Sequence, residues 1–342
     1  MKKVSFFSKI MLLLNMIFSF SLLVACIIPY TSSASLAFVS LAVPLLVILN
    51  ILFFLYWLVR KKYYLLLSLS ILIYGYFSLG TFFGFNSVNK SYSNKNSLSI
   101  MSFNSLGFQG KKHEWESTAG DTIVKFIQEE SPDIVCFQEF DNKKIRSKYF
   151  EEYPFKYVDF EFGPYNGRVI QAIYSKYKIL DNGILEFPES SNSAIFVDVK
   201  YETDILRIYN LHLESLNIRP SSIKKERSDK LFGRLRNSFA KQQEQSTIVR
   251  EHMNNSPYRN IVCGDFNNTQ FSNSYFTVRG DLKDSFLERG KGYGKTINFW
   301  KFPFRIDFIL VDPVFEILSH KNYDINLSDH EPIMATIKIP SE

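Results

Sequence analysis

The segment NIVCGDFN, residues 260–267, is the most informative stretch of this chain. Its Ile-Val-Cys run is typical of a short buried strand, and the run is followed by Gly264-Asp265-Phe266-Asn267. Asp265 is a candidate acid–base group, and Asn267 is a candidate donor to phosphoryl oxygens, because functional side chains often follow a rigid strand. These four residues are harder to explain as a turn than a single Asp or Asn, although taken alone they are also compatible with a tight turn.

Five further polar clusters also lie beside apolar strands. Four are close to a strand end and the fifth is at a strand start. In chain order they are Asn104, Gln138-Glu139, His212, Arg305-Ile306-Asp307 at the strand start, and Ser328-Asp329-His330. Each has a structural alternative: an Asp or Asn after a strand is often a turn former, and a His between leucines is often a core residue. The set as a whole favours a functional site.

The residue types indicate phosphoester chemistry. Glu139 and Asp329 offer hard carboxylate oxygens suited to Mg²⁺ or Mn²⁺, and Asn104 can add a carbonyl oxygen. The other side chains suit proton transfer and phosphate binding: Asp265, Asp307 and His330 as acid–base groups, and His212 and Asn267 as donors. This combination suits attack of an activated water on a phosphodiester.

Apolar runs interrupted by a few helical segments predict the fold class. The strand candidates are residues 98–103, 133–138, 169–174, 194–199, 205–211, 260–263, 305–311 and 333–339, and the helix candidates are residues 118–130 and 222–253. Many strands with helices between only some of them favour a mixed α/β sandwich over a doubly wound parallel sheet.

In type and order, the six clusters resemble the endonuclease/exonuclease/phosphatase family, which includes pancreatic-type deoxyribonucleases, abasic-site endonucleases, neutral sphingomyelinases and inositol-phosphate phosphatases. The matching pieces are Asn104, QE at 138–139, NLHL at 210–213, GDFN at 264–267, RIDFI at 305–309 and SDHEP at 328–332. The resemblance implies a four-layer α/β/β/α sandwich of two packed mixed sheets, with the site at one end.

The resemblance also implies a metal-dependent hydrolase. Glu139 would bind Mg²⁺ or Mn²⁺, assisted by Asn104 and Asp329. The catalytic groups it implies are Asp307, which would hold His330 against the phosphate or water; Asp265, which would orient or deprotonate the water; and Asn267 and His212, which would bind the scissile phosphate.

The first 86 residues contain no Asp or Glu and carry three apolar segments, 10–30, 36–59 and 63–85. Each meets the ~20 residues that a membrane-spanning helix needs. We therefore expect a three-helix anchor at 1–86, a polar linker at 87–97 and a catalytic domain at 98–342. Cys26 also ends a short pattern that resembles a lipoprotein cleavage site, which is an open alternative for the first segment.

Basic residues predict the orientation of the anchor. Lys2, Lys3 and Lys9 precede the first segment, and residues 60–62 join the second to the third. The positive-inside rule places both groups in the cytoplasm, so that three crossings put the catalytic domain outside.

The sequence leaves the substrate open. The net charge is +6, and residues 219–250 are rich in Lys and Arg, which suits a nucleic-acid backbone or anionic lipid headgroups as well as a solvated helix face. Three hypotheses remain: a nuclease, a hydrolase of phospholipids or small phosphate esters, and a catalytically inactive binding module. The intact set of site residues argues against the third.

Overall fold

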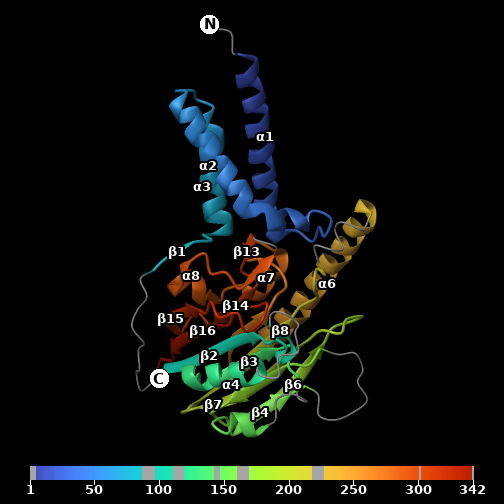
Figure 1. Ribbon diagram of the computed structural model, residues 1–342, viewed down its shortest axis with the longest axis vertical. Helices are drawn as coiled ribbons and strands as arrows, with labels where there is room; N and C mark the ends of the chain where they lie inside the picture. The colour runs from blue at the N-terminus through green and yellow to red at the C-terminus, as the bar shows by residue number, and fades with distance from the viewer. Residues whose placement is uncertain are drawn as a thin grey trace.

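The computed structural model describes residues 5–86, 97–110, 119–141, 147–159, 169–217, 227–299 and 302–340. The larger part of the chain is built on two six-stranded sheets, and three helices stand at one end of it (Figure 1). The predicted linker lies outside the described residues, except for Ser97, which begins a strand.

The first sheet has the strand order β15-β16-β2-β3-β5-β4. Its strands are β2 (Ser97–Asn104), β3 (Ile134–Gln138), β4 (Phe155–Val158), β5 (Ala172–Ser175), β15 (Glu316–Asn322) and β16 (Ile333–Lys338). Strands β2 and β3 are parallel, and the other neighbouring pairs are antiparallel.

The second sheet has the order β10-β14-β9-β8-β7-β6. Its strands are β6 (Ile179–Glu186), β7 (Ser193–Tyr201), β8 (Asp204–His212), β9 (Arg259–Asp265), β10 (Lys283–Asp284) and β14 (Asp307–Val311). Here β8 and β9 form the parallel pair, so both sheets are mixed.

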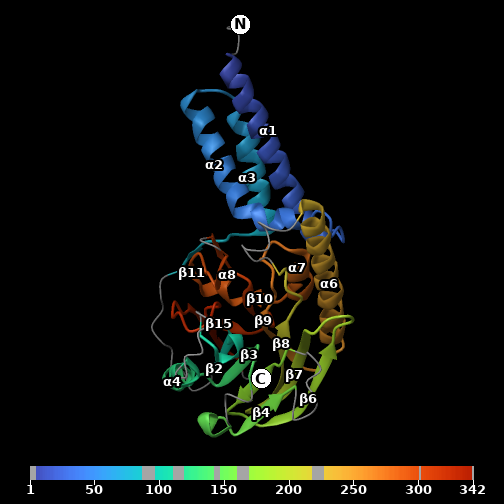
Figure 2. The ribbon, with the colours of Figure 1, turned by 45° about the vertical axis from the view of Figure 1, so that its right-hand side comes forward.

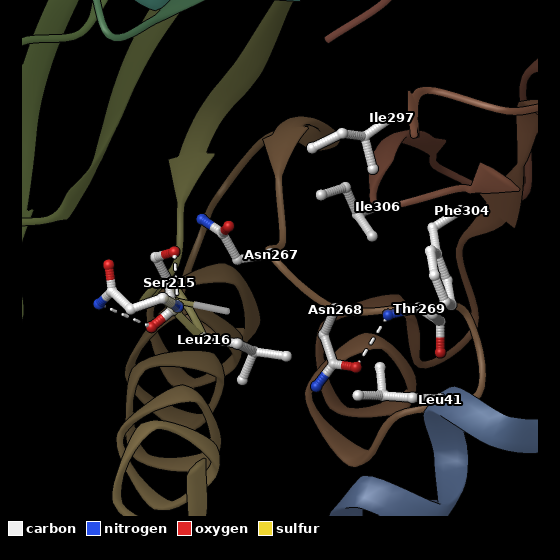
Figure 3. A pocket seen from close by; sticks show the side chains of 10 residues that line it. Leu41, Ser215, Leu216, Asn267, Asn268, Thr269, Ile297, Phe304 and Ile306 are labelled. Atoms are coloured by element: carbon white, nitrogen blue, oxygen red, sulfur yellow. Dashed lines mark hydrogen bonds between the residues drawn. The ribbon is translucent and has the colours of Figure 1, made fainter. Parts of the chain in front are cut away.

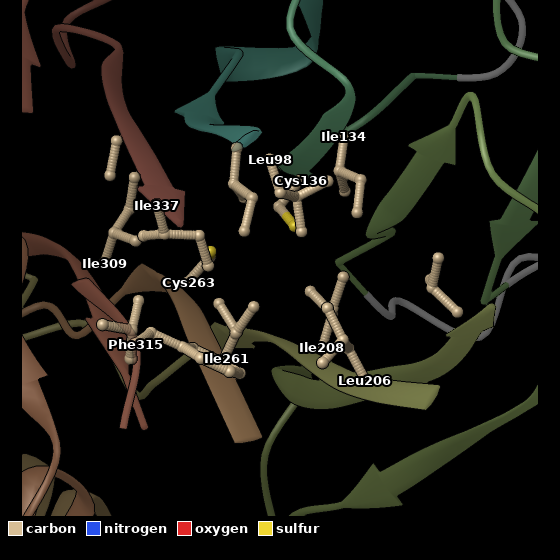
Figure 4. Packing of buried hydrophobic residues seen from close by; sticks show 14 of the residues in the cluster. Leu98, Ile134, Cys136, Leu206, Ile208, Ile261, Cys263, Ile309, Phe315 and Ile337 are labelled. Atoms are coloured by element: carbon tan, nitrogen blue, oxygen red, sulfur yellow. The ribbon is translucent and has the colours of Figure 1, made fainter. Parts of the chain in front are cut away.

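The two sheets pack face to face over an apolar core to which Cys136 of the first sheet and Cys263 of the second both belong (Figure 4). Helix α4 (Ala119–Glu130) packs its apolar side on the outer face of the first sheet. Helices α6 (Ser228–Asn254) and α7 (Asn273–Arg279) cover the outer face of the second. The layers therefore run helix, sheet, sheet, helix, which confirms the predicted α/β/β/α sandwich.

Three helices precede the sandwich: α1 (Phe6–Ile27), α2 (Val43–Val59) and α3 (Leu65–Leu79). Short 3-10 turns, η1 (Ile28–Tyr30) and η2 (Ala37–Ala42), extend the first two. The resulting segments of 25 and 23 residues are long and apolar enough to cross a bilayer.

The prediction of a third span over residues 63–85 was wrong in length. Helix α3 has 15 residues, about 22 Å at 1.5 Å per residue, whereas the hydrocarbon core of a bilayer is ~30 Å thick. The helix ends because Gly80 adopts φ 76°, a conformation that favours glycine. The residues beyond it leave the helical path, and β1 (Gly84–Phe85) pairs with β11 (Lys291–Gly292) of the sandwich.

Polar side chains bind the three helices to one another. Ser19 donates to Asn50 at 2.7 Å, and Ser68 donates to Asn15 at 2.7 Å. All four side chains are buried between the helices, where a hydrogen bond removes the cost of placing a polar group in an apolar medium. Large apolar residues such as Phe20 face outward.

Candidate active site

Strand pairing gathers the predicted site residues at one end of the sandwich. Asn104 ends β2 directly opposite Gln138, which ends the parallel strand β3. His212 ends β8 opposite Asp265 on the parallel strand β9, and Asp307 begins the antiparallel strand β14 opposite Asp265 from the other side. Because parallel strands end at the same edge of a sheet, segments far apart in sequence present their polar residues together.

His330 lies between two buried carboxylates. Its Nδ1 atom is 3.0 Å from Asp307 Oδ2, and its Nε2 atom is 3.6 Å from Asp265 Oδ2. Burial alone would lower the pKa of His330, but the negative charges of Asp307 and Asp265 outweigh it and raise that pKa well above the usual value. The imidazole is therefore oriented as a cation, with Nδ1–H donating to Asp307.

Asp265 is at the centre of the cluster and is 1% exposed. Its carboxylate accepts hydrogen bonds from the backbone N–H of Asn267 at 2.7 Å and from Asn104 Nδ2 at 3.1 Å. Burial raises the pKa of Asp265 to about 6, an increase that His330 opposes. A carboxylate with this pKa is mostly ionised at pH 7 and basic enough to accept a proton from water.

Asn104 joins Asp265 to Glu139. Its Nδ2 atom donates to both carboxylates, at 3.1 Å each, while its Oδ1 atom accepts from the backbone N–H of Leu106. The amide nitrogen, not the oxygen, therefore faces the acids. The side chain of Glu139 is 35% exposed, so that its carboxylate can be reached from solvent. The φ of 49° at Glu139 is rare outside glycine and is typical of strained functional positions.

Asp329 is joined to this centre through Ser328. The Ser328 hydroxyl is buried, donates to the carbonyl oxygen of Asn104 at 2.8 Å and lies 3.2 Å from Asp329 Oδ1. No role was predicted for Ser328, although its position directly before Asp329-His330 in the sequence was a usable signal.

His212 and Asn267 differ in how fully they enter the cluster. His212 Nε2 lies 3.7 Å from Asp265 and 3.8 Å from Glu139, and the ring is 4% exposed. Its Nδ1 atom has no hydrogen-bond partner within the described parts of the chain. Asn267 lies at the rim: its amide Nδ2 donates to the carbonyl oxygen of Leu213 at 2.9 Å.

A second missed feature supports the site from behind. Gln138 donates to Asn210, and Asn210 donates to the carbonyl oxygen of Phe137 at 2.8 Å. This buried amide pair ties β3 of one sheet to β8 of the other. The Gln-Glu and Asn-Leu-His motifs thus each pair a site residue with a residue that fixes the distance between the sheets.

The donor set fits a divalent cation in two places. Glu139 accepts from the Asn104 side chain, and Asp329 is joined to the Asn104 backbone through Ser328, so that these carboxylates are one candidate place. In addition, ligand atoms of Asp265, Asp307 and His330 lie within 4.8 Å of one another. In this second group, however, His330 Nδ1 and Asp307 are already committed to each other, which favours the first place.

Comparison with known proteins concerns the family and the fold. Residues 101–330 match the Endonuclease/Exonuclease/phosphatase family, and residues 8–82 match a domain of unknown function. No curated protein matches the chain.

Three solved structures illustrate the similarity of fold. A humanized D. rerio TDP2 has 19% identity and a TM-score of 0.56, with 71% of this chain and 99% of that chain covered. An endonuclease/exonuclease/phosphatase from Bacteroides vulgatus has 19% identity and a TM-score of 0.56, with 72% and 100% covered. A Bacteroides thetaiotaomicron mannosyl-6-phosphatase has 19% identity and a TM-score of 0.54, with 71% and 100% covered. The chain therefore belongs to the Endonuclease/Exonuclease/phosphatase family.

Proposed function

We propose that this chain is a membrane-anchored, divalent-metal-dependent hydrolase of phosphate esters whose catalytic domain lies outside the cytoplasm. The observation that carries the proposal is the position of Asp265. It lies 3.6 Å from the imidazole that Asp307 holds, and it shares the Asn104 amide with Glu139. A proton acceptor, an oriented cation and an accessible carboxylate thus converge within one cluster.

Glu139, with Asn104 and Asp329, would hold Mg²⁺ or Mn²⁺. Asn104 would serve as an oxygen ligand only after its amide turns over, since its nitrogen now faces Glu139. When bound, the cation supplies positive charge that neutralises the phosphoryl oxygens.

Asp265 would accept a proton as the water oxygen bonds to phosphorus. The phosphorus–oxygen bond to the leaving group then breaks, the leaving oxygen takes a proton from solvent and departs as an alcohol, and Asp265 returns its proton to solvent. His330, oriented by Asp307, would donate Nε2–H to a phosphoryl oxygen. His212 and Asn267 would contact the other oxygens, which requires Asn267 to give up its hydrogen bond to Leu213.

For the membrane part, we propose that the first two apolar segments span the bilayer and that the N-terminus and residues 60–62 face the cytoplasm. Lys2 and Lys3, on which this orientation partly rests, lie outside the described residues. Two crossings alone would return the chain to the cytoplasmic side, so an outside catalytic domain requires α3 (Leu65–Leu79) to cross as well. Its short length can be accommodated by local thinning of the bilayer. We also propose the domain division 1–86, 87–97 and 98–342.

Phosphodiester cleavage of the nuclease type was the first substrate hypothesis. Its sequence support is the basic region 219–250, of which residues 219–226 lie outside the described parts of the chain. Within α6, Arg234 donates to the carbonyl oxygens of Leu216 and Asn217, and Lys241 lies 3.9 Å from Glu214. These cations are thus partly committed to the protein, which weakens the case for a nucleic-acid surface.

The test is a hydrolysis assay of the full-length protein in detergent. Bis(para-nitrophenyl) phosphate, plasmid DNA, RNA, sphingomyelin and phosphatidylglycerol are each supplied with Mg²⁺ and with EDTA, and Asp265→Asn serves as the blank. We expect Mg²⁺-dependent release of alcohol or of cleaved strands from at least one substrate. If none of the five substrates is cleaved in a metal-dependent way, the proposed activity is contradicted.

A further inference from the structure

A cavity of about 300 Å³ lies where the helical anchor meets the sandwich (Figure 3). We call it the junction cleft. Its apolar lining residues are Leu41, Leu216, Ile297, Phe304 and Ile306, and the other half of the lining residues are Asn, Ser and Thr, with Asn267 among them. None of the residues lining it carries a charge. Such a surface suits an apolar ligand.

One end of the junction cleft shares its backbone with the candidate active site. Ile306 directly precedes Asp307, and Ile297 pairs with His330 in an isolated bridge. The backbone N–H of Asn267, at the rim, donates to Asp265. The junction cleft therefore lies next to the candidate active site, with Asn267 at the rim of both.

The other end belongs to the anchor. Leu41 lies in η2, at the start of the second long apolar segment, Ala37–Val59, and the neighbouring Ala37 packs against Leu216 and Phe239 of the sandwich. In both ribbon views η2 lies at the end of the helices that faces the sandwich (Figures 1 and 2). Membrane insertion of those helices would place the cleft at the bilayer surface.

Exposed aromatic residues lie close to the same junction. Phe38 of η2 is 44% exposed and contacts Phe232 of α6, which is 45% exposed. Phe302 begins β13 (Phe302–Phe304), whose last residue lines the cleft, and is 64% exposed. Exposed Phe side chains are compatible with a surface that lies at the headgroup–acyl boundary, where Trp, Phe and Leu form the buried apolar face of interfacial helices.

From these observations we infer that the junction cleft binds an acyl chain of a membrane phospholipid and holds its phosphate ester at Asp265. The inference rests on the proposed function and names its substrate class. A nucleic-acid strand would need cationic walls to neutralise its backbone, and none of the lining residues is Lys or Arg. An acyl chain needs only an apolar wall, which the cleft provides. The anchor would hold the cleft at the membrane that contains the phospholipid.

The kinetic test compares two Trp substitutions on the same segment. Leu41→Trp fills the junction cleft, whereas Leu45→Trp adds the same side chain at a position that is 57% exposed and does not line the cleft. Full-length proteins are assayed in the same detergent micelles with dipalmitoyl phosphatidylglycerol and with bis(para-nitrophenyl) phosphate. The readout is the ratio of the two kcat/KM values, lipid over small diester.

We expect Leu41→Trp to lower this ratio by at least about tenfold, the loss expected when roughly two methylene groups can no longer be buried. Leu45→Trp should leave the ratio within about twofold of the wild type. Equal ratios in the three proteins would overturn the inference while leaving the proposed function intact. Cleavage of neither substrate with Mg²⁺ would count against the proposed function instead.

A binding measurement keeps the inference testable without turnover. A phosphatidylglycerol that carries a diazirine on one acyl chain is photolysed with the full-length protein, and the labelled peptides are identified by mass spectrometry. We expect labelling at Leu216 and Phe304 that is lost in Leu41→Trp and kept in Leu45→Trp. Labelling confined to outward-facing helix residues such as Phe20 and Phe77 would overturn the inference.

Discussion

His330 Nδ1 lies 3.0 Å from Asp307 Oδ2, and both side chains are buried. The two residues are separated by 23 positions and come from a strand start and a loop, so only the folded chain brings them together. Asp307 fixes the ring so that Nε2 points toward Asp265. Asp307 therefore orients the ring through its negative charge as well as through its shape.

Asp307→Asn should therefore lower kcat more than it changes KM. The amide keeps the size of the carboxylate but removes the charge that favours protonated His330, and general acid–base groups typically contribute about 10²–10⁴-fold. Steady-state kinetics on bis(para-nitrophenyl) phosphate at saturating Mg²⁺ measures the effect. Asp324→Asn, at an 83% exposed carboxylate, is the matched control. A kcat within twofold of the wild type would contradict the assignment of Asp307.

Glu139 and Asp265 should separate metal binding from turnover. Glu139→Gln is expected to raise the Mg²⁺ concentration for half-maximal activity by at least about tenfold, since even groups that only orient metal ligands are worth that much. Asp265→Asn is expected to lower kcat about a hundredfold or more with Mg²⁺ affinity, measured by calorimetry, largely kept. Asp181→Asn on the exposed strand β6 is the control. If Asp265→Asn weakened Mg²⁺ binding and Glu139→Gln lowered kcat with Mg²⁺ affinity kept, Asp265 would be the metal ligand and Glu139 the proton acceptor.

The positions of the motif residues were predictable because each follows or begins a buried strand. A strand that is buried on both faces is a continuous apolar run in the sequence, as β3 and β9 are. The pairing of these residues in space was not predictable. His212 and Asp265 lie opposite each other on strands that are separated in the sequence by the whole of α6. Strand β6 (Ile179–Glu186) was missed because it is an edge strand with exposed polar residues.

Two details of the structure have physical causes that the sequence does not display. Composition predicted the third apolar segment up to residue 85, whereas one glycine, Gly80, ends the helix. The direction of the Asn104 amide depends on the backbone N–H of Leu106, which no sequence pattern encodes. The roles of the site residues and the domain boundaries stay predictions.

Membrane orientation can be read with cysteines, because Cys26, Cys136 and Cys263 are all buried. Val314→Cys, at a position 46% exposed on the sandwich, should react with a membrane-impermeant maleimide in intact cells. Lys61→Cys, in the loop between α2 and α3, should react only after lysis. The control is the wild-type chain, whose three buried cysteines should stay unlabelled in intact cells. Labelling of both variants only after lysis would place the catalytic domain in the cytoplasm.

Gly264 and Gly233 form a matched pair for the stability of the site. Gly264 has φ 139° and lies in β9 directly beside Leu211 of β8, and a Cβ there would fall against the Leu211 backbone. Because backbone cannot move aside as a flexible side chain can, Gly264→Ala should force the two parallel strands apart and destabilise the sandwich by more than about 3 kcal/mol.

Gly233, in α6, has open space around its Cα, and Gly233→Ala should stabilise the helix by about 0.5–1 kcal/mol. Thermal unfolding of the full-length protein, followed by tryptophan fluorescence, compares the two variants. The separation of β8 from β9 would also move His212 away from Asp265, so any folded Gly264→Ala protein should lose activity with it. A stable and active Gly264→Ala variant would mean that the β8–β9 register, and with it the position of Asp265, differs from the one described.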